Sequence, residues 1–434
     1  MTERRPLSPF EIGYFGHDTR LGSVPIGGMP LFIGSTVRGR IDPELLRRVL
    51  GELAAGHVLL RSRVIENADG TKVFETDDTY VPALEVRAGG GDEYRELVNT
   101  RQDWGAGLFR AVLLHGADCT RIVLILHHGI SDGRSAFALL DEMWRRYTAQ
   151  LAGSPLPVGD SDRELVPGVD IQLAQVITED EIDGFLGQVL RLAASLGPEA
   201  APRTLPLDGV EDPDGRLALR RISLDAAQTT ALVDIAREQG VSVNSLLGGA
   251  ALAAVRAELD ANPGALPMIC GHAADLRGVL APPLPDATIL NCASGAGTPA
   301  LVDRDADPLE LAHAVEAGMR QVLDTRFPAL FMRASHRPLD PATTAILTGG
   351  PSIALSNIGR LPAHSIPAGV EWVRDDVFAM AASMPPKMTI FTVGDRMTIQ
   401  VEYDTAEHSH AQLDRVGAAM RAQLDRVSAA ALRG

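Results

Sequence analysis

Two adjacent histidines, followed by an aspartate and a glycine, are the residues whose types and spacing could do chemistry in this chain. His127 and His128 come directly after a run of five apolar residues, 122–126, and Asp132-Gly133 follows after three intervening residues. A histidine can accept a proton near neutral pH, and an aspartate within one turn can orient the ring or pair with a cation. The segment therefore predicts a general base supported by a carboxylate.

The elements around these residues would hold them in place. The apolar run predicts a strand buried on both faces, and a helical pattern follows Gly133 to about Tyr147, with apolar residues spaced three and four apart. Polar side chains at such a junction are held by rigid elements yet lie near a surface or cleft. Gly133 would allow a tight turn or a close approach of the backbone there.

The two histidines cannot both enter one cleft, because neighbouring side chains of a strand point to opposite faces. Both faces of the strand at 122–126 are apolar, so the pattern does not show which histidine faces the cleft. Adjacent histidines are for the same reason poor co-ligands, which argues against a metal-dependent hydrolase using one of them with Asp132. The simpler alternatives are two hydrogen-bonded histidines closing a strand and an aspartate that only caps a helix.

The pattern His-His-x-x-x-Asp-Gly resembles the motif of the chloramphenicol-acetyltransferase-like superfamily, which includes nonribosomal condensation domains and stand-alone acyltransferases. Its position also fits, about 130 residues into a chain of 434. Three further segments are similar to segments of this superfamily: Leu7-Ser-Pro, His57-Val-Leu-Leu-Arg61 and Ser356-Asn-Ile-Gly359. The resemblance covers nearly the whole chain and is greatest to the polyketide-synthase-associated (Pap-type) acyltransferases.

The resemblance implies a role for each matching residue. His128 would be the base, His127 would support the turn, and Asp132 would shape the site by pairing with Arg277, which follows a predicted strand. Gly133 would serve the turn. Weaker candidates for binding substrate or a developing oxyanion follow other predicted strands or loops: Ser356, Asn357 and Asn291. Ordinary turns and a solvated arginine are the alternatives for these outlying positions.

The function implied by the resemblance is acyl transfer without a metal or redox cofactor. The base would take a proton from a hydroxyl group as it attacks a thioester carried on coenzyme A or on the phosphopantetheine of a carrier protein. An ester would form, in polyketide or lipid-type secondary metabolism. An amide-forming condensation enzyme with an amine acceptor is the alternative, and a condensation-like binding module without activity is a third possibility.

Composition limits the partners and the location. The formal charge of −16 argues against nucleic acid, and an acidic carrier protein could dock only on a local basic patch. Such a patch could form along Arg320, Arg326, Arg333 and Arg337, although a solvated face is the simpler interpretation. Three cysteines are too few for a disulfide framework or zinc site, and neither a signal peptide nor a run of 18 apolar residues is present. We expect a cytoplasmic monomer without an integral membrane segment.

Helical and strand patterns are mixed throughout both halves of the chain. This predicts an α/β (α+β) two-domain sandwich, and the resemblance implies two chloramphenicol-acetyltransferase-like halves with mixed sheets and a substrate tunnel between them. The predicted domains are residues 1–170, which carry the motif, and 171–434, which complete the tunnel. Near the end of the chain the patterns predict a strand over 378–383 and a closing helix over 409–432.

Overall fold

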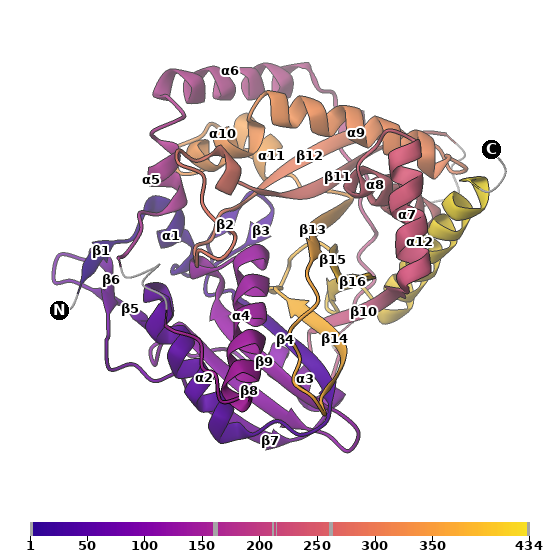
Figure 1. Cartoon of the computed structure of the whole chain (residues 1–434). Helices are drawn as coiled ribbons and strands as arrows, with labels where there is room; N and C mark the ends of the chain where they lie inside the picture. Colours follow the sequence, from indigo (N-terminus) through magenta and orange to yellow (C-terminus); the bar gives the residue numbers. More distant parts are fainter. Residues whose placement is uncertain (1–2, 159–163, 211, 214, 260–263, 432–434) are drawn as a thin grey trace.

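The computed structural model describes residues 3–158, 164–210, 212–213, 215–259 and 264–431. Two large sheets, one built mainly from each half of the chain, form its frame (Figure 1). The first sheet has the order β14-β4-β9-β8-β7 and the second has the order β10-β16-β15-β13-β11-β12. The end predicted for the closing helix, at residue 432, lies outside the described residues.

Both sheets mix parallel and antiparallel neighbours, which confirms the predicted fold class. β7 runs parallel to β8, and β13 runs parallel to both β11 and β15, whereas the remaining pairs of the two sheets are antiparallel. The strands of the first sheet are β4 Pro30–Arg38, β7 Leu84–Ala88, β8 Phe109–His115, β9 Thr120–His127 and β14 Glu371–Phe378. Those of the second are β10 Leu217–Leu224, β11 Leu266–Asp275, β12 Ala293–Val302, β13 Ile353–Leu361, β15 Lys387–Val393 and β16 Arg396–Asp404.

Helices cover the outer face of each sheet. Figure 1 shows α2 and α4 against the first sheet, and α7, α8, α9 and α12 around the second. The helices are α1 Pro9–Tyr14, α2 Pro43–Gly56, α3 Gly91–Asn99, α4 Gly133–Leu151, α5 Val169–Leu173, α6 Glu179–Ser195, α7 Ala226–Glu238, α8 Val243–Glu258, α9 Pro308–Asp324, α10 Phe327–Ala334, α11 Pro341–Thr348 and α12 His410–Ala431. Smaller strands are β1 Arg4–Pro6, β2 Arg20–Leu21, β3 Val24–Pro25, β5 Ser62–Glu66 and β6 Lys72–Thr76.

The strand β14 comes from the second half of the chain but completes the first sheet, where it pairs with β4. The strand predicted over 378–383 is therefore wrong, since the structure ends β14 at Phe378 and leaves the next residues outside any strand. The misplacement has a physical reason: β14 contains two adjacent acidic residues, Asp375 and Asp376, which disfavour a strand in isolation but are buried and paired in the folded protein.

Two hydrophobic cores correspond to the two sheets. One surrounds β4, β9 and α4 and also includes apolar residues from 276–393, and the other lies between the second sheet and its helices. Because apolar residues of both halves share the first core, the chain order does not separate the halves completely, and the division at residue 170 stays a prediction. In the described part of the chain no single helix has the length and apolar composition to cross a membrane, although the sharply bent pair α7 and α8 meets these criteria together.

Candidate active site

The predicted strand, turn and helix are all present around the paired histidines. All eight residues of β9 are buried, and the strand ends at His127. His128 begins a short 3-10 turn, His128–Ile130, and Asp132 is the N-cap residue of α4. The residue spacing of the motif thus follows from a buried strand that must turn sharply before a capped helix can start.

His127 is packed into the protein. It is 1% exposed, its ring stacks on Phe15 with centroids 3.9 Å apart, and the edge of Trp104 lies against it at 4.8 Å. Its Nδ1 accepts a hydrogen bond of 3.0 Å from the backbone N–H of Gly129. Burial, with a smaller contribution from neighbouring His128, lowers the pKa of His127 to about 3. A neutral, buried ring that hydrogen-bonds to the backbone of the turn fits the structural role predicted for His127.

His128 lies less deeply buried, between α1 and the loop that carries Asn291. Its backbone N–H donates to the carbonyl of Met29 at 2.9 Å, and the ring centroid of Tyr14 lies 5.5 Å from its own. Asn291 donates from Nδ2 to the His128 carbonyl oxygen at 2.8 Å and lies 3.4 Å from Nδ1 of the ring. The ring is therefore held from both sides.

The electrostatics of His128 favour an unprotonated ring. Burial lowers its pKa below the ordinary value of 6.5, and the nearby Lys387 cation lowers it further. Hydrogen bonds to the backbone at His128 and Ser131, and the charge of Asp132, act in the opposite direction without reversing the shift. Only Nδ1 can reach the residue's own carbonyl, so Nε2 is the nitrogen left to take a proton from a substrate.

Asp132 forms the predicted ion pair with Arg277. Its Oδ2 lies 2.6 Å from Nη1 of Arg277 and accepts a second hydrogen bond, of 2.8 Å, from the backbone N–H of Cys292. Its Oδ1 accepts from the N–H of Ser135, so the carboxylate also caps α4. Burial alone would raise the pKa of Asp132, but Arg277 and these donors outweigh it and the pKa is lowered. Both proposed roles of this aspartate, cap and ion-pair partner, are present together.

Arg277 connects three segments. The Asp132 and Arg277 side chains are only 5% and 2% exposed, and the guanidinium also donates to Asp275 at 3.1 Å and to the carbonyl of Leu290 at 2.8 Å. The start of α4 is thereby tied to the end of β11 and to the loop that carries Asn291 and Cys292. This buried arginine is not the solvated turn residue of the simpler alternative.

Gly133 and the Ser356–Gly359 segment meet across the two halves. A Cβ atom at Gly133 would lie 3.0 Å from Cδ1 of Ile358, so the glycine permits the close approach that its position predicted. Ile358 projects from an irregularity in β13, where Asn357 accepts through Oδ1 from the N–H of Gly359 at 3.0 Å. Ser356 and Asn357 thus stand on a strand beside the motif, and their substrate-binding role stays a prediction.

Asn291 hydrogen-bonds to His128 in this structure. Its amide nitrogen donates to the His128 carbonyl, and its Oδ1 accepts from the N–H of Ala293 at 3.0 Å. With both ends of the side chain engaged by the protein, the geometry supports positioning of the histidine, and the predicted substrate contact stays untested.

Tyr14 is a site residue that the sequence did not reveal. It is 4% exposed, contacts His128, and its hydroxyl hydrogen-bonds with Asn291. Burial raises the pKa of Tyr14 to about 12, so the hydroxyl keeps its proton. The only signal was indirect: the predicted Ser8-Pro9 helix start, whose capping box with Glu11 is present, fixes the helix that ends at Tyr14.

The arginine stretch is not an open basic face. Each of its members pairs with acidic residues, three of them with the first turn of α6: Arg320 with Glu316, Arg326 with Glu181, Arg333 with Glu179, and Arg337 with Glu179 and Asp183. Because these carboxylates neutralise the arginines, the stretch gives no support to the idea of a carrier-protein docking patch.

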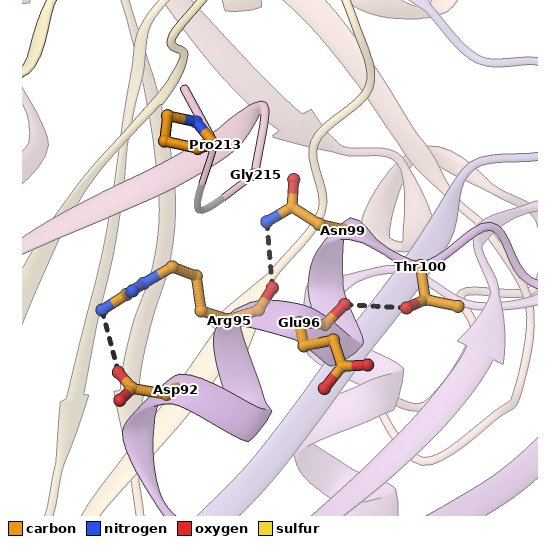
Figure 2. A pocket seen from close by; sticks show the side chains of 7 residues that line it. All are labelled: Asp92, Arg95, Glu96, Asn99, Thr100, Pro213 and Gly215. Atoms are coloured by element: carbon orange, nitrogen blue, oxygen red, sulfur yellow. Dashed lines mark hydrogen bonds and ion pairs between the residues drawn. The ribbon is translucent and has the colours of Figure 1, made fainter. Parts of the chain in front are cut away.

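Neither a metal cluster nor a surface hollow competes with this site. In the described ranges no group of three or more His, Cys, Asp or Glu side chains could hold a metal ion. A polar surface hollow of about 500 Å³ lies between α3 and residues 213 and 215 (Figure 2). Figure 2 shows Asp92, Arg95 and Asn99 along it, with Asp92 paired to Arg95. None of its lining residues belongs to the histidine motif.

Comparison with known proteins gives a consistent result. A family model described as the phthiocerol/phthiodiolone dimycocerosyl transferase C-terminus matches residues 213–402. A phthiocerol/phthiodiolone dimycocerosyl transferase from Mycobacterium ulcerans is 26% identical over 338 residues, which cover 78% of each chain. The structure of polyketide synthase associated protein 5 from Mycobacterium tuberculosis superposes with a TM-score of 0.71 at 21% identity, covering 96% of this chain and 97% of that one.

A more distant solved structure has the same fold. A trichothecene 15-O-acetyltransferase from Fusarium sporotrichioides matches with a TM-score of 0.74 at 13% identity, over 98% of this chain and 96% of that one. Two mixed sheets with a His-His-x-x-x-Asp-Gly segment at the end of a buried strand define the fold class: it is the fold of the condensation and chloramphenicol-acetyltransferase-like structures. Within it, the chain is an acyltransferase whose homologues are the dimycocerosyl transferases of the polyketide-synthase-associated type.

Proposed function

We propose that this acyltransferase moves an acyl group from a thioester to the hydroxyl group of a lipid-type alcohol and so forms an ester. The thioester would be carried on coenzyme A or on the phosphopantetheine of a carrier protein. Relatives named as phthiocerol/phthiodiolone dimycocerosyl transferases support an acyl donor and a long hydroxylated acceptor. They favour a hydroxyl over an amine acceptor, because the amide-forming condensation domains resemble this chain in fold only.

The observation that carries the proposal is the placement of His128. Nε2 takes the proton of the acceptor hydroxyl while the oxygen attacks the thioester carbonyl carbon, and a C–O bond forms. The tetrahedral intermediate then collapses, the C–S bond breaks, and Nε2 of His128 gives its proton to the departing sulfur, which leaves as a thiol. A lowered pKa keeps the ring unprotonated at neutral pH, so the base is ready without prior deprotonation.

Asp132 is not a second base in this scheme. Its carboxylate is fully engaged by Arg277 and by two backbone N–H groups, and it stays ionised. The ion pair instead fixes the positions of the end of β9, the start of α4 and the Asn291 loop around His128. We retain a cytoplasmic location, a monomeric state and a tunnel between the halves as part of the proposal.

The test is an acyl-transfer assay that follows thiol release and product mass with a panel of acyl-coenzyme A donors, alcohols and matched amines. We expect ester products, unchanged activity in EDTA, and a loss of about 10²–10⁴-fold in turnover for His128→Ala. His313→Ala, on the exposed face of α9, is the control and should retain full activity. Products formed only with amines would contradict the ester assignment, and activity lost in EDTA and restored by zinc would contradict the metal-free mechanism.

A further inference from the structure

Three arginines converge on one buried aspartate where the two sheets meet. Nη2 of Arg221 on β10 lies 2.5 Å from Asp376 on β14, Nε of Arg374 lies 3.3 Å from it, and Nε of Arg121 on β9 lies 3.8 Å from it. β9 and β14 belong to the first sheet and β10 to the second. We call these four residues the arginine cluster.

The arginine cluster carries an excess of positive charge. Asp376 is 2% exposed and is the carboxylate partner of all three guanidinium groups in the part of the chain that the structure describes. The next carboxylate inward, Glu402, does not compensate them, because it lies 3.1 Å from Nζ of Lys387. Arginine cannot release its proton in this setting, so the excess has to be balanced by solvent or by a bound anion.

The cluster also has hydrogen-bond donors without acceptors. Nη1 of Arg121 and Nε of Arg221 are buried and bond to no acceptor among the described residues. The ring of Tyr94 lies 4.3 Å from the Arg121 guanidinium carbon, and burial raises the pKa of Tyr94, so its hydroxyl keeps a proton to donate. Buried donors of this kind are uncommon in folded proteins and call for a partner.

The three arginines of the cluster differ in how exposed their side chains are. The Arg374 and Arg221 side chains are 36% and 26% exposed, whereas that of Arg121 is 9% exposed. Beyond Asp376, the buried face of the second sheet continues with Gln400, which donates to Glu402 at 3.3 Å, and then with Lys387. The charge of Lys387 in turn lowers the pKa of His128.

The distance from the cluster to the histidines is of the same order as the length of a known chemical spacer, and the arginine side chains shorten the gap. Arg121 and His127 are at opposite ends of β9, six residues apart, which corresponds to about 20 Å at ~3.3 Å per residue. A phosphopantetheine arm has about thirteen bonds from phosphorus to sulfur and, at the ~1.2 Å per bond of an extended backbone, spans roughly 16 Å. A phosphate at the arginines would therefore leave the thioester near the end of β9.

We propose that Arg121, Arg221 and Arg374 form an anion subsite that binds the phosphate of the donor's pantetheine arm. Guanidinium groups bind phosphate oxygens through paired N–H donors, and Asp376 holds the three arginines in place without neutralising them. The inference rests on the proposed thioester donor and adds the chemical feature by which that donor is recognised. Coenzyme A and carrier proteins share this phosphate, so the subsite serves either source.

The kinetic test compares donors that differ by the phosphate. Acyl-phosphopantetheine and acyl-coenzyme A carry it, and acyl-pantetheine does not. For Arg221→Gln and Arg374→Gln we expect the KM of both phosphorylated donors to rise about 10-fold or more, as for a lost hydrogen bond to a charged group, with kcat little changed. The KM of acyl-pantetheine should stay at the wild-type value in both variants.

Arg220→Gln is the matched control. Arg220 is the neighbour of Arg221 on β10, faces the other side of the strand, and pairs with Asp414 at 2.6 Å. It should leave the KM of every donor unchanged. An equal rise in KM for phosphorylated and unphosphorylated donors would overturn the subsite, and so would an effect seen with acyl-coenzyme A but absent with acyl-phosphopantetheine, which would place the contact on the nucleotide.

A binding experiment separates this inference from the proposed function. Free 4′-phosphopantetheine should raise the Tm of the wild type and of Arg220→Gln more than pantetheine does, and this difference should disappear in Arg374→Gln. If no thioester supports turnover but the phosphate-dependent Tm shift is present, the proposed reaction fails and the subsite stands. If turnover is normal and no phosphate dependence appears in either measurement, the subsite is refuted.

Discussion

At the scale of single residues, His127 and His128 are chemically identical neighbours with different surroundings. The stacked, almost fully buried ring of His127 bonds the turn, whereas the ring of His128 is held by Tyr14 and Asn291 and presents Nε2. The two environments thus follow from the end of β9, where the side chain of His127 is still part of the strand and His128 begins the 3-10 turn.

We expect the two histidines to separate in a paired measurement. His127→Ala leaves the Gly129 N–H without its acceptor and removes the stack on Phe15, so it should lower the free energy of unfolding by about 1–3 kcal/mol. His128→Ala should change the Tm little and reduce kcat by about 10²-fold or more. A fully stable, inactive His127→Ala beside an active His128→Ala would mean that the base is the other histidine.

Tyr14 offers a prediction about positioning. Tyr14→Phe keeps the ring against His128 but removes the hydroxyl that bonds Asn291, so the imidazole should be held less firmly. We expect kcat to fall about 10-fold, in line with one lost hydrogen bond, while the KM values stay close to wild type.

The control for Tyr14 is Tyr147→Phe, which removes another buried hydroxyl, one that accepts from the Asp42 N–H at 2.8 Å. It should affect stability without lowering kcat. Equal effects of the two variants on kcat would show that Tyr14 matters only for packing.

At the scale of elements, the Asp132–Arg277 pair connects the start of α4 to the end of β11. Removing one partner leaves the other charge buried and uncompensated, which costs roughly 3–5 kcal/mol. Asp132→Ala and Arg277→Ala should each destabilise by that amount, and the double variant should cost less than the sum of the two. Chemical denaturation of the four proteins measures this, and strict additivity would exclude coupling between the side chains.

The elements also show what the sequence could and could not predict. β9 and α4 were predictable because an apolar run, a cap residue and helical spacing all lie within thirty residues. β12 was not, since Ala293-Ser-Gly-Ala-Gly-Thr298 has few residues with strand preference and is a strand only because β11 pairs with it along its whole length. Tyr14 and Lys387 were missed for a related reason: they approach His128 only through tertiary packing, which leaves no local pattern.

At the scale of the whole molecule, the return of β14 to the first sheet joins the two halves. His364, in the segment between β13 and β14, lies with Nδ1 3.2 Å from Asp141 of α4 and Nε2 2.8 Å from Asp375 of β14. Asp375 also accepts from Ser35 of β4 at 2.5 Å. The imidazole thus fastens the crossing segment directly to α4 of the first half and, through Asp375, to β4.

This fastening should depend on pH. Burial alone would lower the pKa of His364, but hydrogen bonds and charges from Asp141 and Asp375 outweigh it and raise the pKa to about 9. A pKa raised above the unfolded value of about 6.5 stabilises the fold fully below pH 6.5, and the contribution is lost as the pH rises through 9. We therefore expect the free energy of unfolding to fall, by up to about 3 kcal/mol, between pH 6.5 and 9.5.

The matched variant for this pH dependence is His364→Gln, which has both N–H donors on one nitrogen, so it cannot bridge the two carboxylates as the imidazole does, and which does not titrate. It should be less stable than the wild type at pH 6.5, and its stability should change much less between pH 6.5 and 9.5. Urea denaturation at several pH values gives both curves. Parallel curves for the two proteins would mean that His364 is neutral in the fold and that other contacts, such as the pairing of β14 with β4, hold the crossing segment.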